Sequence, residues 1–224
     1  MNLLFVDVEN NENNDILSIS YIFINIKTNE YNMEHYLIKC NSSKKDMYYK
    51  THHHLHTNIL QSRGFDKEYV LNRFIEYVNK CDKIVGHYVI SDINKIYLNI
   101  LQYNKDFDKL VLFNKFDENY DTYNFEKQLG NKNNKLQNVY IKYFNDEELN
   151  WHSSYDDIIA TYKIFCKQHN IQSINLYLTT ENNKFHNRYY NNTLCISKDC
   201  CNQYLINYFT KNNYKQSTNY YFIN

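Results

Sequence analysis

The chain has 224 residues, 17% of them aromatic, and its 25 acidic and 25 basic residues give a formal net charge of zero. This length allows one domain with a sizeable core, and a hydrophobic content of 43% excludes an intrinsically disordered chain. The balanced charge excludes the strongly basic surface of many nucleic-acid-binding proteins, but it leaves open a nucleic-acid substrate that is held at one end.

The composition carries information about the source and the compartment. Proline is absent, glycine occurs three times, Ala160 is the single alanine, and Asn, Lys, Ile and Tyr are abundant. The abundant residues have AT-rich codons, which points to an AT-rich genome such as that of a large DNA virus or an AT-rich protist. The six cysteines form no regular framework, so we expect reduced thiols in an intracellular protein of the cytoplasm, the nucleus or a viral replication compartment. No stretch approaches the roughly 18 apolar residues of a membrane helix, and we expect neither a signal peptide nor a membrane partner.

The first part of the chain is rich in strand signals. Three strands are predicted from the partial alternation of β-branched or aromatic residues with polar ones, at 3–8, 16–26 and 33–39. A long loop with short helical pieces is expected at 42–66. Helices are then predicted at Lys67–Lys80, 89–101, 135–144 and Ser153–Gln168, and strands at Lys83–Gly86 and 109–113. This order predicts an α/β or α+β domain in which helices are layered on a sheet. Residues 169–224 have weaker periodicity, and we expect a poorly defined C-terminal extension there.

The first strand ends on two acids, Asp7 and Glu9, in the stretch LLFVDVENNE. Side chains two residues apart on a strand point to the same face, so these carboxylates converge at the carboxyl end of the strand. Two close carboxylates repel each other unless they are protonated or bridged by a cation, and their oxygens suit Mg²⁺ or Mn²⁺. A solvated strand end is the alternative interpretation.

Two later helices carry an acid in their first turns. Asp92 follows a short strand in KIVGHYVISDINKIYL, and Asp157 lies in WHSSYDDIIATYKIF. Ser153 and Ser154 each precede an acid by three residues in the manner of a capping box, which leaves His152 just outside the helix. An imidazole beside a carboxylate suits a general base near a metal site. Each acid alone also fits a structural role, because an acid at a helix start complements the helix dipole.

Together the three stretches resemble the motifs of the DEDDh 3′–5′ exonucleases, the superfamily of polymerase proofreading subunits, oligoribonuclease and ribonuclease T. The family motifs F-x-D-x-E, G-H-N-x-x-F-D and H-x-A-x-x-D-A-x-A-T match Phe5, Asp7 and Glu9; Gly86, His87 and Asp92; and His152, Asp157, Ala160 and Thr161. The Asp-Thr pair in residues 120–125 lies where the family has a strand end. The chain departs from the family at positions that shape the fit around the terminal nucleotide: Asn10, Asn11, Tyr88 and Ser91.

The resemblance covers residues 1–168 and implies a ribonuclease H-like fold, with a mixed central sheet flanked by helices. It also implies a metal-dependent 3′–5′ exonuclease that acts on single-stranded or frayed DNA or RNA ends and releases nucleoside 5′-monophosphates. Asp7, Glu9, Asp92 and Asp157 would hold two Mg²⁺ or Mn²⁺ ions about 3.5–4 Å apart, and His152 would take a proton from the attacking water. The alternative is a catalytically inactive nucleic-acid-binding or scaffold module that keeps the fold.

Other clusters of histidine, cysteine and tyrosine residues give weaker signals of function. A zinc site in the histidine run at 51–56, or around Cys195, Cys200, Cys201 and His186, lacks the usual ligand spacing. The tyrosine-rich C-terminal region could stack unpaired bases, but ordinary packing is the favoured explanation in so tyrosine-rich a chain. Residues 200–209 could supply a dimer face, and a homodimer or a polymerase or replication partner stays open.

Overall fold

The computed structural model describes residues 1–39, 55, 57–145, 149, 151–176 and 178, together with the strand backbones at 187–190, 193–197 and 220–223. The histidines of residues 51–56, most of the predicted loop before them, the predicted dimer face and the side chains of the C-terminal cysteine and tyrosine clusters lie outside the described residues.

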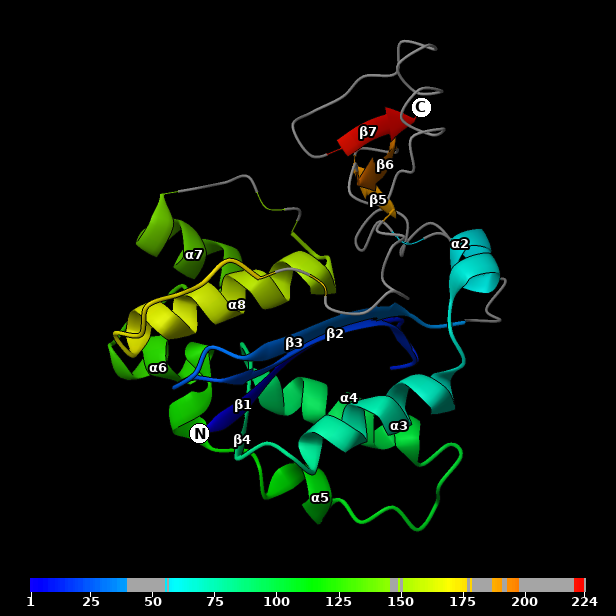
Figure 1. The fold of residues 1–224 in the computed structure, drawn as a ribbon, viewed down its shortest axis with the longest axis horizontal. Coiled ribbons are helices and arrows are strands. Elements are labelled where there is room, and N and C mark those ends of the chain that lie inside the picture. The colour runs from blue at the N-terminus through cyan, green and yellow to red at the C-terminus, as the bar shows by residue number, and fades with distance from the viewer. Residues whose placement is uncertain are drawn as a thin grey trace.

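A four-stranded mixed sheet lies at the centre of the fold, in the order β3-β2-β1-β4 (Figure 1). Its strands are β1 (Asn2–Asn10), β2 (Ile16–Asn25), β3 (Tyr31–Leu37) and β4 (Lys83–Val85). β1 pairs antiparallel with β2, β2 pairs antiparallel with β3, and β4 runs parallel to β1. The four strands predicted at the corresponding positions are confirmed, with small differences at their ends.

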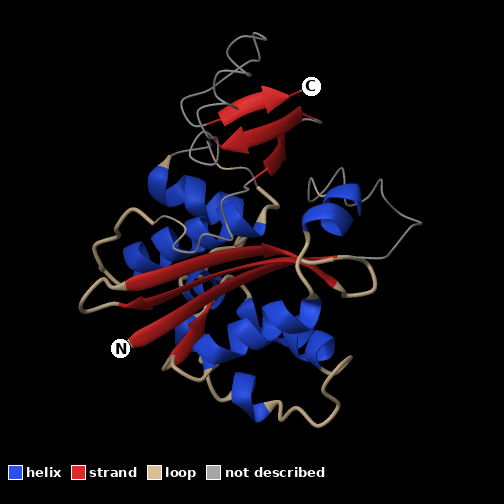
Figure 2. Ribbon diagram, turned by 45° about the vertical axis from the view of Figure 1, so that its right-hand side comes forward, coloured by secondary structure: helices blue, strands red, loops and turns tan. Residues whose placement is uncertain are grey.

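Helices cover both faces of this sheet (Figure 2). α3 (Lys67–Val78) and α4 (Val89–Ile100) lie on one face, and α8 (Ser154–Gln168) lies on the other. Against α8 pack α6 (Thr122–Gln128) and α7 (Leu136–Phe144). The remaining helical pieces are α2 (Thr57–Arg63), α5 (Leu110–Phe113) and the short 3₁₀ helix η1 (Glu118–Tyr120). The predicted helices that correspond to α3, α4, α7 and α8 are confirmed.

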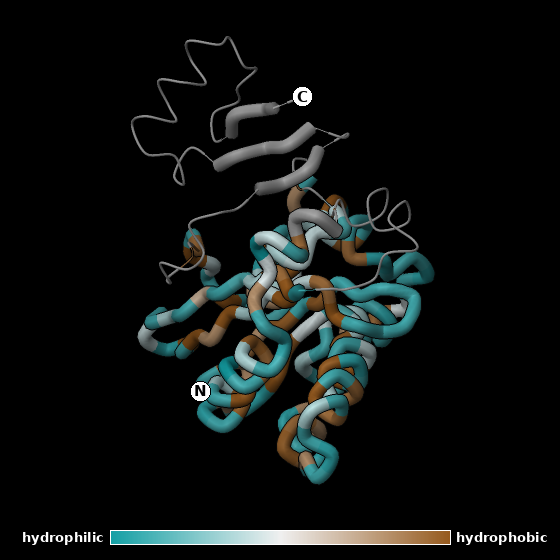
Figure 3. The backbone as a smooth tube through the Cα atoms, turned by 90° about the vertical axis from the view of Figure 1, so that its right-hand side faces the viewer, coloured by the Kyte–Doolittle hydropathy of each residue, from teal (hydrophilic) through white to brown (hydrophobic). Residues whose placement is uncertain are grey.

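The alternation of side chains along β1 divides the core in two. Leu4, Val6 and Val8 pack with α3 and α4, whereas Leu3 and Phe5 pack against α8. Figure 3 shows hydrophobic residues in the central segments and hydrophilic residues in the outer turns. Because a strand has a side-chain period of two, Asp7 and Glu9 continue the row of Leu3 and Phe5 on the α8 face.

The strand predicted at 109–113 is wrong, because residues Leu110–Phe113 form α5. The Asp108 carboxylate accepts a hydrogen bond from the Leu110 N–H, and the Phe113 N–H donates to the Lys109 carbonyl. Of the four helical residues, Leu112 is buried and Leu110 is exposed. A short apolar run has no periodicity that separates a strand from a single helical turn, so local hydrogen bonds decide.

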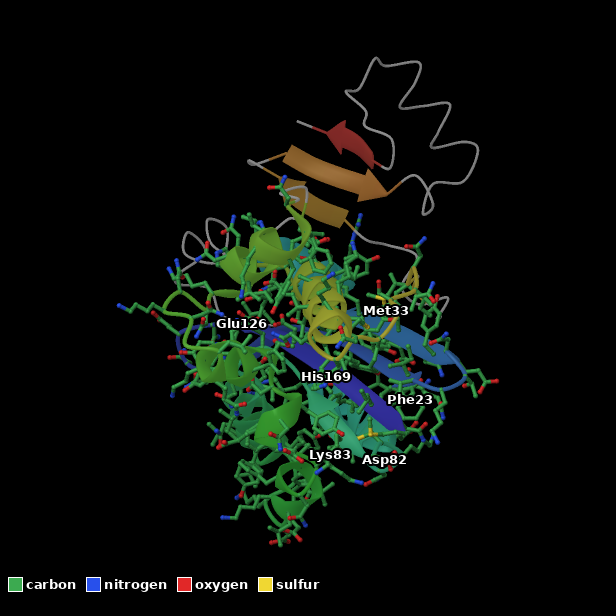
Figure 4. All side chains as sticks on the ribbon, turned by 90° about the vertical axis from the view of Figure 1, so that its left-hand side faces the viewer. Phe23, Met33, Asp82, Lys83, Glu126 and His169 are labelled. Atoms are coloured by element: carbon green, nitrogen blue, oxygen red, sulfur yellow. The ribbon has the colours of Figure 1, made fainter. Side chains whose placement is uncertain are left out.

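A buried acid, Glu126, joins the three helices of the α8 layer (Figure 4). Its carboxylate on α6 accepts hydrogen bonds from Lys142 Nζ at 2.8 Å and the Tyr143 hydroxyl at 2.5 Å, both on α7. Gln168 Nε2 on α8 donates at 3.0 Å. Burial raises the pKa of Glu126, but these donors outweigh burial and hold the pKa below its ordinary value. Glu126 is therefore a fully paired structural acid.

Beyond α8, Ile171, Ile174 and Leu176 pack against the core cluster on that face. Three further strands, β5 (Asn187–Tyr190), β6 (Thr193–Ser197) and β7 (Tyr220–Ile223), form an antiparallel sheet in the order β5-β6-β7. The division of the chain after residue 168 stays a prediction. Within the described residues, Cys81 and Cys166 are buried free thiols. None of the described helices has the length and hydropathy needed to cross a membrane.

Candidate metal centre

The carboxyl end of β1 places two acids opposite two serines of β2. In the antiparallel register, Asp7 pairs with Ser20 and Glu9 pairs with Ser18. A register shift follows between Glu9 and Asn10, which is a β-bulge of the kind found beside active sites. The polar ends of both strands therefore meet on the face that α8 covers.

The serines dock the first turn of α8 onto the sheet. Ser154 Oγ is hydrogen-bonded to Ser18 Oγ at 3.0 Å and to Ser20 Oγ at 2.9 Å, and all three side chains are buried. Ser153 is the N-cap residue, as expected, but its side chain caps no backbone N–H. The predicted capping box is therefore wrong, because Ser153 makes no such bond and the Ser154 hydroxyl is hydrogen-bonded to the serines of β2 instead. Small side chains at this contact bring the start of α8, with Asp157, close to the acids of β1.

Three carboxylates converge at this contact. Asp7, Glu9 and Asp157 each offer an oxygen atom, and these atoms lie within 4.8 Å of one another. Burial, and then the charges of Asp92, Asp157 and Glu9, raise the pKa of Asp7. Burial and the charge of Glu9 likewise raise the pKa of Asp157. The three groups repel one another as carboxylates, so the site favours either protons or a cation.

Asp92 adjoins this group from the first turn of α4. Its carboxylate is 7% exposed and accepts a hydrogen bond from Lys95 Nζ at 3.4 Å, one turn later on the same helix. Burial raises the pKa of Asp92 to about 7, Lys95 opposes this shift, and the charge of Glu9 adds to it. The structure therefore brings all four predicted acids into one electrostatic group, three of them within 4.8 Å and Asp92 beside them.

His152 lies on the exposed turn that precedes α8. Its backbone is in the left-handed region, with a φ of 66°. A hydrogen bond from the His152 backbone N–H partly offsets the rise in the pKa of Asp157. The turn thus places the backbone of His152 beside Asp157, and the role of its imidazole stays a prediction.

His87, which matches the second motif, is a structural residue here. Its ring is held between two segments: Nε2 donates to the Asn134 carbonyl at 2.6 Å, and Nδ1 is hydrogen-bonded to Thr122 Oγ1 at 2.8 Å. Both ring nitrogens are occupied, and burial lowers the pKa of His87.

Asp121 is a structural acid whose importance the sequence only hinted at through the Asp-Thr pair. The backbone of Asp121 pairs with that of Gly86 in an isolated parallel β-bridge, and Asp121 is fully buried at the N-terminus of α6. Its carboxylate accepts hydrogen bonds from four backbone N–H groups, two at the start of α4 and two at the start of α6: those of Tyr88, Val89, Tyr123 and Asn124, at 2.9, 2.9, 2.9 and 3.4 Å. One carboxylate thereby fixes the starts of both helices.

A hydrogen-bonded asparagine, Asn11, organises the turn after Glu9. Asn11 Oδ1 accepts from the backbone N–H groups of Asn13 and Asp15, at 2.9 and 2.8 Å. Asn99 on α4 holds the same turn, because its Nδ2 donates to the Asn14 carbonyl at 2.7 Å. The loop beside the acids is therefore tied to the helix that carries Asp92.

The donor set fits a hard divalent cation. All the converging groups are carboxylates, which suit Mg²⁺ or Mn²⁺ rather than zinc or copper. Within the described part of the chain, Asp157 Oδ1 is buried and has no hydrogen-bond partner. A buried carboxylate oxygen that accepts no hydrogen bond needs another partner, and a bound cation would supply one.

No protein-family model matches the chain, and no curated protein matches it by sequence. A structure described as the crystal structure of full-length 3′-exonuclease is similar at a TM-score of 0.51 and 15% identity. That similarity covers 81% of this chain and 65% of the other, so this chain spans just under two thirds of that protein. A second structure, described as the 3′-end specific recognition of histone mRNA stem-loop by 3′-exonuclease, has a TM-score of 0.53 and 14% identity over 90% of this chain and 92% of the other. The chain therefore has the ribonuclease H-like α/β fold of these 3′-exonucleases, as the motifs implied.

Proposed function

We propose that this chain is a metal-dependent 3′–5′ exonuclease of the DEDDh type. It would hydrolyse the phosphodiester bond at the 3′ end of single-stranded or frayed DNA or RNA and release nucleoside 5′-monophosphates. The convergence of Asp7, Glu9 and Asp157, with Asp92 beside them, is the observation that carries this proposal. It occurs at the carboxyl end of the first strand of a fold that the chain shares with 3′-exonucleases.

The acids would hold the metal and orient the substrate. Asp7, Glu9 and Asp157 would bind Mg²⁺ or Mn²⁺, and Asp92 would complete the set for a second ion once Lys95 is displaced. The bound ions would supply Lewis-acid activation of water and stabilisation of the leaving oxygen. The bulge after Glu9 and the serine contact under α8 support the close approach of the four side chains.

His152 would act on the proton of the attacking water. Its imidazole is exposed, and its backbone is held in an unusual conformation beside Asp157. A neutral imidazole nitrogen can accept a proton from water and release it to solvent, which typically contributes about 10²–10⁴-fold to a rate. Exposure of the ring lets the proton leave after each turnover.

The proposed substrate is a DNA or an RNA end, and the test has an arm for each. One of the similar proteins is described as a 3′-exonuclease that recognises the 3′ end of a histone mRNA stem-loop, which makes RNA an essential arm of the test. The 25 acidic and 25 basic residues of this chain balance, which favours short ends or a partner that supplies the nucleic acid.

The proposal is tested with matched 5′-labelled single-stranded DNA and RNA, in Mg²⁺ or Mn²⁺. We expect a ladder of products that shorten by single nucleotides, and we expect a 3′-phosphate to slow or block the reaction. Asp157→Asn should abolish the ladder. The control is Glu76→Gln, which removes an exposed acid whose side chain is 55% accessible on α3 and should change nothing.

Two results would contradict the proposal. Cleavage of circular single strands, or release of the 5′ label first as a mononucleotide, excludes a 3′–5′ exonuclease. Binding of oligonucleotides without any hydrolysis, and without coupling of Mn²⁺ to stability, instead favours the inactive scaffold module.

A further inference from the structure

One bulky residue in the described part of the chain has a left-handed backbone beside an element of the acid site. Six non-glycine residues have a positive φ: Asn14, Asn29, Tyr88, Asn145, His152 and Asn170. Asparagine tolerates the left-handed region, but a bulky aromatic residue there is an outlier that needs a reason. Tyr88 is the bulky exception in this set, and it immediately precedes α4, the helix that carries Asp92.

A buried carboxylate holds Tyr88 in this conformation. Asp121 accepts hydrogen bonds from the backbone N–H groups of Tyr88 and Val89, both at 2.9 Å. The Tyr88 φ of 60° and ψ of 43° leave its side chain outside the helix, where it makes no capping bond. The surrounding structure therefore maintains a conformation that the residue itself disfavours.

The strained backbone presents an aromatic ring to solvent. Tyr88 is 53% exposed, and its ring lies 5.3 Å from the ring of Tyr123 at an interplanar angle of 58°. The Tyr123 ring in turn lies edge-on to His87, at 5.7 Å and 87°. Since His87 is fixed through both ring nitrogens, the Tyr88–Tyr123 pair rests on a rigid base.

The pair lies next to the acids. Gly86, two residues before Tyr88, packs so closely on β1 that an added Cβ would lie 3.2 Å from the carbonyl oxygen of Val6, the residue before Asp7. Asp92 follows Tyr88 in the first turn of α4. The backbone of Tyr88 thus lies between the strand that carries Asp7 and the helix that carries Asp92.

We propose that the Tyr88–Tyr123 pair is a stacking platform for one unpaired nucleobase of the substrate, an inference that rests on the proposed nuclease function. Every nucleobase has a flat π-face, so an exposed tyrosine can bind DNA and RNA ends without reading their sequence. Tyr88 differs from an ordinary exposed tyrosine such as Tyr69 because its backbone is held in a left-handed conformation that a bulky side chain disfavours. The platform would position the strand, while the acids act on the phosphate.

Substitutions at Tyr88 distinguish the contribution of the ring to substrate binding from that of the backbone conformation. Tyr88→Asn removes the ring and keeps a residue that tolerates a positive φ, so the melting temperature should equal or exceed that of the unchanged protein. With single-stranded substrates, KM should rise about tenfold, or about 1.4 kcal/mol, with little change in kcat. Tyr88→Phe retains the ring and should restore KM. Tyr88→Gly, which the backbone also accepts, is the second variant should Asn lower the melting temperature.

A substrate series gives the readout that a purely structural role would not change. An abasic residue is moved in turn through the last few positions of matched DNA and RNA oligonucleotides. At one position the loss of the base should raise KM for the unchanged protein but not for Tyr88→Asn. The control is Tyr69→Asn, because Tyr69 on α3 is 48% exposed and lies against Phe65, at 6.3 Å. That variant should show the unchanged abasic profile.

The proposal is overturned if Tyr88→Asn leaves KM unchanged, or if its abasic profile matches that of the unchanged protein. Should the unchanged protein cleave no substrate, the nuclease function fails separately. Fluorescence anisotropy with the same oligonucleotides, in Ca²⁺, then still decides the stacking role. Equal affinities of the unchanged protein and Tyr88→Asn for every oligonucleotide would exclude it.

Discussion

Buried acids in the described part of this protein occupy two kinds of environment. In one, hydrogen-bond donors surround the carboxylate, and in the other, several carboxylates lie close together. Glu34 on β3 is fully buried and accepts hydrogen bonds from the hydroxyls of Tyr21, Tyr36 and Tyr77 and from Arg73. Although burial raises the pKa of Glu34, these donors lower the pKa below its ordinary value. The donors around Glu126 have the same effect on its pKa. The acids of the candidate metal centre instead face one another, and the pKa values of Asp7, Asp92 and Asp157 are raised.

Substitution of one acid from each environment should have opposite effects on stability. Asp157→Asn removes a repelling charge, so in EDTA its melting temperature should rise, while hydrolysis falls by about 100- to 1000-fold. Glu126→Gln removes a charge that accepts hydrogen bonds from four side chains, those of Asn131, Lys142, Tyr143 and Gln168, so its melting temperature should fall. Thermal unfolding in EDTA measures both. A marked loss of stability in Asp157→Asn would make Asp157 a structural acid.

His152 should be separable from the metal ligands. His152→Ala should lower kcat by about 10²–10⁴-fold and leave Mn²⁺ affinity, measured by calorimetric titration, nearly unchanged. His169→Ala is the matched control, because His169 is an exposed imidazole at the other end of α8. It should leave both quantities as they are. Weaker Mn²⁺ binding by His152→Ala, by tenfold or more, would instead make the imidazole a metal ligand.

At the scale of elements, long periodic segments were predictable and short contacts were not. The spacing of five apolar residues predicts α3, and all of them except Ile75 are buried: Val70, Leu71, Phe74, Ile75 and Val78. Local hydrogen bonds turned residues Leu110–Phe113 into a helix, which periodicity could not reveal in so short a run. The Ser154 hydroxyl bonds to serines more than 130 positions away in sequence, so strand pairing, not the local pattern, decided its role.

The two helices that meet at Asp121 should lose their fixed geometry when its carboxylate is removed. Asp121→Ala leaves the N–H groups at the starts of α4 and α6 without their acceptor. We expect a loss of about 2–4 kcal/mol in the free energy of unfolding, or roughly 4–16 °C in melting temperature. Asp117→Ala is the control, because Asp117 caps η1 at the surface and should cost less than about 1 kcal/mol. Equal losses for the two variants would show that Asp121 is an ordinary helix cap.

At the scale of the molecule, the candidate site depends on segments that are distant in sequence. Motif order and strand alternation were enough to predict Asp7, Glu9, Asp92 and Asp157, since each stands at a strand end or in a first helical turn. The Tyr88–Tyr123 pair could not be predicted, because it depends on a left-handed residue and on a contact between α4 and α6. The sequence motifs thus located the acids that the structure brings together, and they gave no signal for the contact between Tyr88 and Tyr123.

The acid cluster should also give the metal-free protein an unusual pH dependence of stability. An ordinary aspartate has a pKa of 3.8, whereas burial raises the pKa of Asp92 to about 7, and burial raises the pKa values of Asp7 and Asp157 as well. Between these values the folded state binds more protons than the unfolded state, so these acids favour folding at low pH and oppose it as the pH rises. His87 has the opposite effect, because its lowered pKa disfavours the fold at low pH.

We therefore compare the unchanged protein with Asp157→Asn, which retains His87, by thermal unfolding in EDTA from about pH 5 to 8. Relative to the variant, the unchanged protein should lose stability as the pH rises through this range. Mn²⁺ at the upper pH should stabilise the unchanged protein more than the variant, because a cation replaces the protons that the carboxylates have lost. Should the two proteins share one pH profile, and gain equally from Mn²⁺, the four acids do not act as one metal-binding group.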